Sequence, residues 1–320
     1  MTNAFTHRNH YIPQQYQLGF ANDLGRVWLF DRETLQFRNS NPVDIGIRRD
    51  FYTTVDAGGI QNDLVEKVLA LLEGVVWPVI DSLERGATEI SADDRAHLAL
   101  FASLMKTRTP VFDYISNSTN EQLLKWSAKA RTPTLEALAQ EYARVTGQAI
   151  DQREAETLHK VIQEDAYVVE TPRQNTIKMM LQIAVTLSEA LITLDWTIYK
   201  TPLDFTFLTS DNPFIVIPAP NHDHTLSGAG PLSKGATSLV PLSKTLLLAM
   251  GHNGKGFLRH VKAGRDFVRY ANQTVTRNCD RFLIGRDEAH LRKIVQLTKI
   301  DQWKNDFSPV LIVPDPIKSE

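Results

Sequence analysis

Apolar residues change their spacing twice along the chain, and these changes mark three regions. Residues 26–31 form a short run of strand-forming residues that follows the turn-forming residues 22–25. Residues 37–38 are the expected hairpin partner, and Asn41-Pro42 closes the region. The N-terminal region is therefore predicted to be β-structure.

In the second region, apolar residues recur every three or four positions, which is typical of helices with one buried face. The first such stripe consists of Ile60, Leu64, Val68, Leu71, Leu72, Val75 and Val79. Pro78 predicts a kink near the end of this helix. Ser91 and Asp94 form a capping box for a second helix, which Pro110 interrupts. Further helices are predicted at residues 135–145, 154–164 and 176–199.

From residue 205 onward, short apolar runs replace the helical spacing. Strands are predicted at residues 205–209, 214–217, 238–242, 245–250, 281–284 and 310–313, and helices at 267–278 and 288–297. Residues 218–235 are polar and contain His222 and His224, for which a solvated loop is favoured over a metal site. The basic residues around His252 and His260 favour a solvated hairpin turn over a nucleic-acid site.

The predicted elements run in the order strands, then helices, then strands mixed with helices. This order differs from the regular alternation of strand and helix in a doubly wound sheet. The order predicts an α+β fold with an N-terminal β segment, a central helical subdomain and a C-terminal mixed β-sheet with helices. We expect one compact domain over residues 1–320, with the helical subdomain at about 60–199 and the β-rich part at about 203–314. The N-terminal strands are expected to pair with C-terminal ones.

Composition narrows the possible classes of protein. The 35 basic and 37 acidic side chains give a net charge of -2, so no global field favours DNA or an anionic membrane, although a local basic groove stays open. Cys279 is the only cysteine, which excludes an internal disulfide and a multi-thiolate zinc site and favours a buried residue. Residues 1–13 lack a secretory signal, and charges interrupt the apolar run 179–196. We expect a core helix, no membrane insertion and a cytoplasmic location.

Two polar stretches carry candidate chemistry, although the standard nucleotide, serine-hydrolase and zinc-protease fingerprints are absent. The first, residues 7–20, gathers histidine, tyrosine and glutamine around Pro13. In the second, residues 207–214, a predicted strand runs into Ser210, Asp211 and Asn212 before Pro213. Such a strand end can present a site, but it is also a favourable turn, and the turn is favoured on physical grounds alone.

These stretches resemble a known family. The motifs are Asn9-His-Tyr-Ile-Pro-Gln14, Gly19-Phe20, Val27-Trp-Leu-Phe-Asp-Arg32, Asp50-Phe-Tyr52, Arg108-Thr-Pro110 and Thr209-Ser-Asp-Asn-Pro213. In this order, from about residue 8 to 290, they resemble domain-of-unknown-function family 4238, a mostly bacterial set of stand-alone proteins. Gln15 and Gln17 are minor departures from the family pattern. The resemblance implies relatedness and a bacterial origin, and it brings no mechanism with it.

If the motifs converge on one cleft, their chemistry is that of a hydrolase. His10 would act as general acid or base, Asp211 would orient it or bind a metal, and Arg108 would stabilise negative charge. The remaining candidates for substrate binding are Asn9, Tyr11, Gln14, Arg32, Ser210 and Asn212. A divalent metal is a candidate cofactor, with Asp31 and Asp50 as its possible ligands. The substrate would be a phosphodiester or another anion, which makes a nuclease one version of the hypothesis and an anionic small molecule or nucleic acid the candidate partner.

The alternative is a non-catalytic binding or interaction protein in which the same motifs are structural. Each residue has such a role available: His10 can bond backbone, Asp31 and Arg32 can form a hairpin-end ion pair, and Arg108 can cap a helix. Burial separates the two hypotheses. An open pocket with convergent side chains favours the enzyme, and a buried, fully hydrogen-bonded cluster favours the structural role.

Overall fold

Two mainly antiparallel sheets form the centre of the protein. The computed structural model describes residues 7–55, 58–220, 229–251 and 256–302. The larger sheet has the strand order β12-β7-β11-β10-β9, and only β12 and β7 run parallel. Its strands are β7 (Asp195–Lys200), β9 (Ile215–Ile217), β10 (Thr237–Pro241), β11 (Leu246–Gly251) and β12 (Leu258–Lys262).

The smaller sheet joins the two ends of the chain and confirms the expected pairing between them. Its order is β3-β2-β13-β8, all antiparallel, with the N-terminal β2 beside the C-terminal β13. These strands are β2 (Val27–Asp31), β3 (Gln36–Ser40), β8 (Thr209–Ser210) and β13 (Phe282–Gly285). Two short pairs complete the strands: β1 (Arg8–His10) with β4 (Ile47–Arg49), and β5 (Thr54–Val55) with β6 (Gln61–Asn62).

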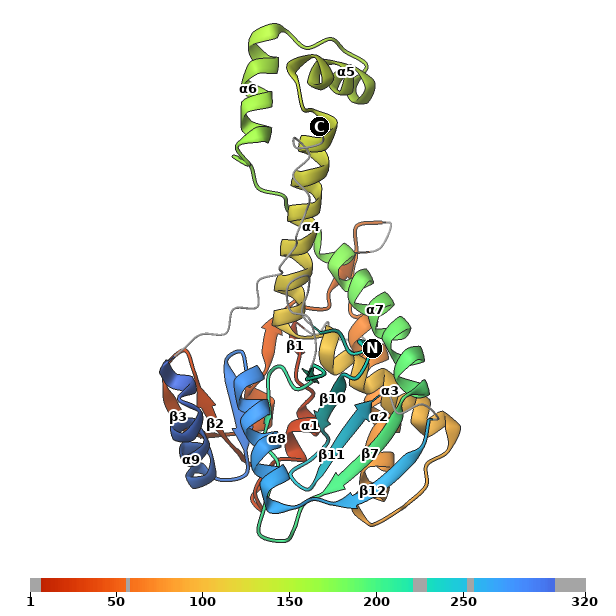
Figure 1. Ribbon diagram of the computed structural model, residues 1–320, viewed down its shortest axis with the longest axis vertical. Coiled ribbons are helices and arrows are strands. Elements are labelled where there is room, and N and C mark those ends of the chain that lie inside the picture. Colours follow the sequence, from red (N-terminus) through yellow and green to blue (C-terminus); the bar gives the residue numbers. More distant parts are fainter. Residues whose placement is uncertain (1–6, 56–57, 221–228, 252–255, 303–320) are drawn as a thin grey trace.

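Helices surround the sheets, and one group of them projects. Helices α2, α3 and α7 pack on one another beside the larger sheet, whereas α8 and α9 accompany the smaller one. Helix α4 extends away from the body and carries α5 and α6 at its far end (Figure 1). The α-helices are α1 (Gln14–Leu18), α2 (Leu64–Glu84), α3 (Ala92–Thr107), α4 (Pro110–Arg131), α5 (Leu135–Thr146), α6 (Gln152–Gln163), α7 (Arg173–Thr193), α8 (Arg265–Asn278) and α9 (Glu288–Thr298). Short 3-10 helices lie at η1 (Pro42–Asp44) and η2 (Ile300–Gln302).

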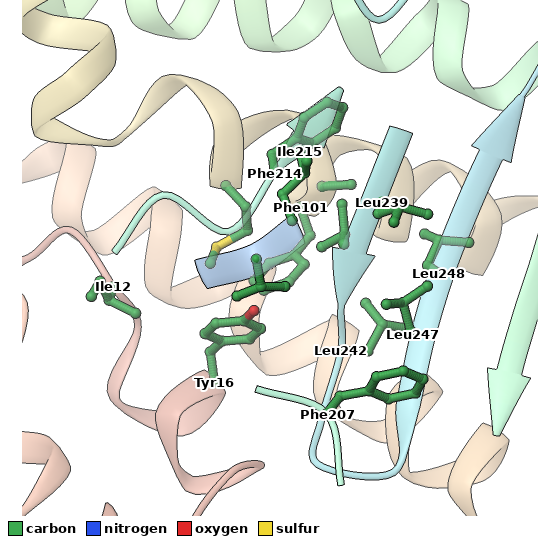
Figure 2. Close-up of a cluster of buried hydrophobic side chains, with 14 of the residues drawn as sticks. Ile12, Tyr16, Phe101, Phe207, Phe214, Ile215, Leu239, Leu242, Leu247 and Leu248 are labelled. Carbon is green, nitrogen blue, oxygen red and sulfur yellow. The ribbon is translucent and has the colours of Figure 1, made fainter. Parts of the chain in front are cut away.

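Tyr16 of α1 joins the two sheets inside the core. Its ring is fully buried beside Phe101, and its hydroxyl reaches the sheets (Figure 2). The hydroxyl donates to the carbonyl oxygen of Pro241 in β10 at 2.7 Å and lies 2.6 Å from the Thr209 hydroxyl in β8. A buried phenol needs hydrogen-bond partners, and Tyr16 finds one in each sheet. These contacts hold both sheets against the N-terminal segment.

The end of α7 was predicted wrongly from the sequence. The helix predicted to Tyr199 stops at Thr193, and residues 195–200 form β7. Arg95 of α3 explains the stop, because its guanidinium donates to the carbonyls of Ile192 at 3.1 Å and Leu194 at 2.6 Å. These are carbonyls that a helix end leaves without partners. Of the described helices, α7 is long and apolar enough to cross a membrane, but its buried side packs on α3 as expected of a core helix.

The sequence did not predict α4 and β12, because few of their residues are buried. Helix α4 has a mostly polar surface with three buried residues, so no apolar stripe marked it. Strand β12 lies at the sheet edge with four exposed residues, and its basic side chains had favoured a turn. Of the strand predicted at 205–209, only Thr209 lies in β8. The candidates His222, His224 and His252 and the strand at 310–313 lie outside the described residues.

Helix α2 buries a different face from the one predicted. The stripe residues Leu64, Val68, Leu71 and Val75 are exposed, as is Ile60 before the helix. The buried residues of α2 are Val65, Leu69, Val76, Val79, Ile80 and Leu83. The prediction was therefore right for Val79 and wrong for most of the stripe, because α2 is apolar on more than one face.

Substitution of Tyr16 tests how strongly the sheets depend on its hydroxyl. We expect Tyr16→Phe to lower the free energy of unfolding by about 1–3 kcal/mol, because Thr209 and the Pro241 carbonyl lose a buried partner. Urea denaturation measures this value. Tyr270→Phe, at a ring that is 46% exposed, is the matched control and should change stability little. Equal stability of both variants and the wild type would contradict this role for Tyr16.

Candidate functional site

Asp211 is buried at the point where the chain passes from the smaller sheet to the larger one. Its side chain is 1% exposed. Oδ1 accepts the N–H of Asp280 at 3.0 Å, and Oδ2 accepts the N–H groups of Arg281 at 2.7 Å and Phe282 at 3.0 Å. Burial raises the pKa of the Asp211 carboxyl to about 7, while these amides act in the opposite direction. Both carboxyl oxygens are thus committed to backbone.

We call residues 279–282 the connector, because they join α8 to β13. Arg32 donates to the carbonyls of Cys279 at 2.7 Å and Asp280 at 2.8 Å. Arg281 in turn binds Asp31 through two hydrogen bonds, at 3.1 and 3.0 Å. Asp31 thus forms ion pairs at the hairpin end, with Arg281 and, at 3.6 Å, with Arg38 of β3, while Arg32 donates to connector carbonyls.

The rest of the Thr209–Pro213 motif also binds its surroundings. The Asn212 side chain donates to the Asn278 carbonyl at 3.0 Å, and the Asn278 side chain donates back to the Asn212 carbonyl at 2.7 Å. The Ser210 hydroxyl accepts the N–H of Asn212 at 3.2 Å, as in a Ser turn. The motif thus combines the turn that the sequence favoured with long-range contacts to the end of α8.

Arg108 forms a second cluster with the N-terminal segment. It is 2% exposed and donates to the His10 carbonyl at 2.6 Å, to Glu73 at 2.8 Å and to the Tyr52 hydroxyl at 3.3 Å. The neighbouring Tyr52 and Glu73 raise the pKa of Arg108, so the guanidinium is charged. Asn9 is also buried and accepts the N–H of Tyr52 at 3.1 Å. This cluster ties the first strand to α2 and α3.

His10 is half-buried at the edge of this second cluster. Its Nε2 lies 3.2 Å from the Val43 carbonyl, and burial lowers the pKa of the imidazole. A neutral ring that donates from Nε2 satisfies this contact. Glu66 belongs to the same cluster through Arg108 and Asn9, its Oε2 is buried without a hydrogen-bond partner, and burial raises the pKa of Glu66 to about 6.

The candidate residues form two clusters: a first cluster of Asp211 with the connector, and the second cluster around Arg108. Tyr11, whose pKa is raised by burial and by the Asp211 charge, is close to the first cluster. Within the described chain, no hydrogen bond or ion pair joins His10 to Asp211. Gln14 is exposed, Tyr11 is buried, and Asp50 contacts His7 at 2.7 Å. No group of three His, Cys, Asp or Glu side chains among residues 7–55, 58–220, 229–251 and 256–302 is arranged to hold a metal ion.

Several contributors carried no recognisable signal in the sequence. Gln17, noted only as a departure from the family pattern, is fully buried and donates to the carbonyls of Ile12 at 3.0 Å and Ile45 at 3.1 Å. Arg281 lies outside every motif, and its role depends on Asp31, which is distant in sequence. Cys279 is buried as expected.

A pocket of about 650 Å³ lies between α8, α9 and residues 203–206. His290 projects into it with its Nδ1 at 3.4 Å from the Thr206 hydroxyl and its Nε2 at 3.4 Å from the Asn272 amide. Asn272 is buried and also donates to the Thr206 carbonyl at 2.8 Å. The rest of the wall combines the basic Arg269, Arg286 and Lys293, the acidic Asp204 and Asp287, and apolar side chains that include Phe205, Val268 and Ile294.

The pocket and the first cluster share the same segments. Helix α8 ends at Asn278, which Asn212 holds, and β13 leads from the connector to Arg286 and α9. Residues 203–206 lead directly into β8 and Asp211. All three walls of the pocket are therefore attached to the Thr209–Pro213 motif.

These features define an α+β protein whose polar motifs join distant segments beside a pocket of ligand size. The chain belongs to the family described as protein of unknown function (DUF4238), whose model matches residues 8–289, and the resemblance read from the motifs is confirmed. Comparison with curated proteins found no match, and comparison with solved structures found none.

Replacement of Asp211 tests the first cluster. At pH 8, we expect Asp211→Asn to lower the free energy of unfolding by about 2–4 kcal/mol, because the new NH₂ group must face either the N–H of Asp280 or those of Arg281 and Phe282. Chemical denaturation measures the loss. Asp44→Asn, at a 63% exposed carboxylate, is the control and should stay within about 0.5 kcal/mol of wild type. Wild-type stability of Asp211→Asn would contradict the bonding pattern described above.

Glu66 predicts a pH dependence of stability. Because its pKa is about 6 in the folded protein and 4.5 as a free side chain, the folded state binds the proton more tightly. This contribution is complete below pH 4.5 and is lost as the pH rises through 6, by at most about 2 kcal/mol. Glu66→Gln should remove that loss, which denaturation at pH 4.5 and pH 7.5 measures. An unchanged pH slope in Glu66→Gln would show that Glu66 ionises normally.

Proposed function

We propose that this protein is a non-catalytic binding protein that holds an anionic small molecule in the pocket between α8 and α9. The observation that carries the proposal is that three basic side chains, Arg269, Arg286 and Lys293, line the pocket with the half-buried His290 and outnumber its two acidic side chains, Asp204 and Asp287. In this proposal the Thr209–Pro213 and N-terminal motifs are structural, and their role is to hold the walls of the pocket.

The size and lining of the pocket suit an organic anion. A volume of about 650 Å³ lies in the range that small-molecule sites occupy. Phe205, Val268 and Ile294 offer an apolar surface, and His290 with Asn272 offers a few fixed polar groups. A ligand with an apolar body and one anionic group would match both parts.

The charges of the pocket are available to a ligand at small cost. Arg286 pairs with Asp23 and Arg269 with Asp266, but both acidic partners are exposed, at 83% and 96% of their side chains. Exposed ion pairs contribute at most about 1 kcal/mol, so either arginine can exchange its partner for a ligand anion. Burial lowers the pKa of His290, and both nitrogens of its neutral ring already face Thr206 and Asn272, so the basic side chains and not the imidazole would bind the anion.

A hydrolase of phosphodiester or related substrates is the second candidate function. It is favoured by Glu66 near Arg108 and the half-buried His10, because burial raises the pKa of Glu66 to about 6, toward the range in which acid–base catalysts work, and keeps the His10 ring neutral. It is weakened by Asp211 and Arg108, whose polar atoms are already engaged with backbone and neighbouring side chains.

Binding of 1-naphthyl phosphate tests both functions with one probe. We expect isothermal titration calorimetry to detect its binding, and to find weaker binding of 1-naphthol, which lacks the anion, and of inorganic phosphate, which lacks the apolar body. Arg269→Gln with Lys293→Gln should weaken the binding of 1-naphthyl phosphate at least about tenfold, equivalent to about 1.4 kcal/mol. Arg153→Gln with Lys160→Gln on α6 removes the same charge outside the pocket and should leave the affinity unchanged.

The outcomes separate the two functions. Equal affinity for 1-naphthol, or an affinity that the pocket variant does not alter, would contradict the binding proposal. Release of fluorescent 1-naphthol that requires His10 would instead support a hydrolase, whether or not Mg²⁺ is added.

A further inference from the structure

Helix α2 presents an apolar stripe to solvent beside its buried face. The stripe consists of Leu64, Val68, Leu71 and Val75, which are 63%, 51%, 73% and 44% exposed. Scattered exposed apolar residues are ordinary on a protein surface, but four in a row along one helix face form a continuous patch. This patch has no role in the pocket or in the two motif clusters.

The spacing of the stripe is that of a coiled-coil seam. Intervals of four, three and four residues place Leu64 and Leu71 at d positions and Val68 and Val75 at a positions of a heptad. A β-branched residue at a with leucine at d is the pattern that parallel two-stranded coiled coils prefer. The stripe ends before Pro78, which interrupts the hydrogen-bond ladder of the helix.

Gly74 lies beside this stripe and is not required by the chain's own packing. A Cβ atom at this position would meet no other atom within 4 Å. Glycine in a helix interior costs about 1 kcal/mol relative to alanine, so the residue weakens α2 without a packing benefit within the described chain. Beside an apolar seam, a missing side chain allows the backbone of a second helix to approach closely.

We infer that α2 is the interface of a homodimer in which the stripes of two copies pack together about a two-fold axis. A two-fold interface requires a self-complementary surface, and a heptad seam of alternating leucine and valine is one. From their exposed fractions, the four stripe residues expose roughly 400 Å², half of the about 800 Å² that each partner buries in a standard interface. Lys67 beside the seam is paired with Asp63 at 2.7 Å, so like charges do not oppose association.

Sedimentation velocity of the full chain tests this inference. We expect the wild type to be dimeric at about 100 µM, and Leu71→Glu to be monomeric with a dissociation constant at least about a hundredfold larger, because a buried charge would face its twin. Leu71 is exposed in the single chain, so Leu71→Glu should keep the thermal midpoint of the isolated monomer. Leu24→Glu places the same charge at an 83% exposed leucine outside the stripe and should remain dimeric.

Thiol cross-linking gives a second readout that does not depend on the glutamate variant folding. Cys279 is the only cysteine and is fully buried, so an introduced thiol is the accessible one. Leu71→Cys should form a disulfide-linked dimer under mild oxidation, whereas Leu24→Cys should not. A monomeric wild type, a dimer that survives in Leu71→Glu, or equal cross-linking through residue 24 would overturn the inference. Binding of a different protein to the stripe of a monomeric chain would assign it another partner.

Discussion

The structure depends on a buried carboxylate that receives three consecutive backbone amides. Asp211 links segments that are about seventy residues apart, and it does so where the chain changes from one sheet to the other. A buried carboxylate is costly unless its lone pairs are satisfied, and buried amides are costly unless they find an acceptor. Asp211 and the connector satisfy one another, so neither arrangement is stable without the other. The position of β13, between β2 and β8, follows from this pairing.

The same principle governs the N-terminal segment. Asn9, Tyr16, Gln17 and Arg108 use their polar atoms mainly on backbone groups of other elements. A short segment with little regular structure cannot satisfy its own amides and carbonyls, so it needs such partners to be buried. Polar motifs that suggest catalysis in a sequence can serve this purpose equally well. A catalytic motif directs its polar atoms into a pocket, whereas a structural motif directs them to backbone groups. The sequence alone does not show which of these directions applies.

The parts of the fold that the sequence predicted are those with local causes. The 26–31 strand and its hairpin, the Ser91 cap and the helices near residues 135–145 and 288–297 follow from turn chemistry, capping and spacing. The parts of the fold that the sequence did not predict depend on distant partners. Arg95 of α3 ends α7, and the neighbours of α2 decide which of its apolar faces is buried. Of the candidate site, the sequence supplied the polar residues but not their partners, because Asp211, Arg108 and Asn9 bind groups that are distant along the chain.

The first cluster and the pocket are connected through the segment that joins α8 to α9. Helices α8 and α9 are separated in sequence by the connector and β13, so the angle between them depends on how this segment is held. Three amides bound to Asp211, two carbonyls bound to Arg32 and the reciprocal contact of Asn212 with Asn278 fix it at one geometry. His290 and Asn272, one from each helix, then meet at hydrogen-bond distance across the pocket. Polar contacts outside the pocket can therefore set the shape of the proposed binding site, because the pocket lies between elements and not within one.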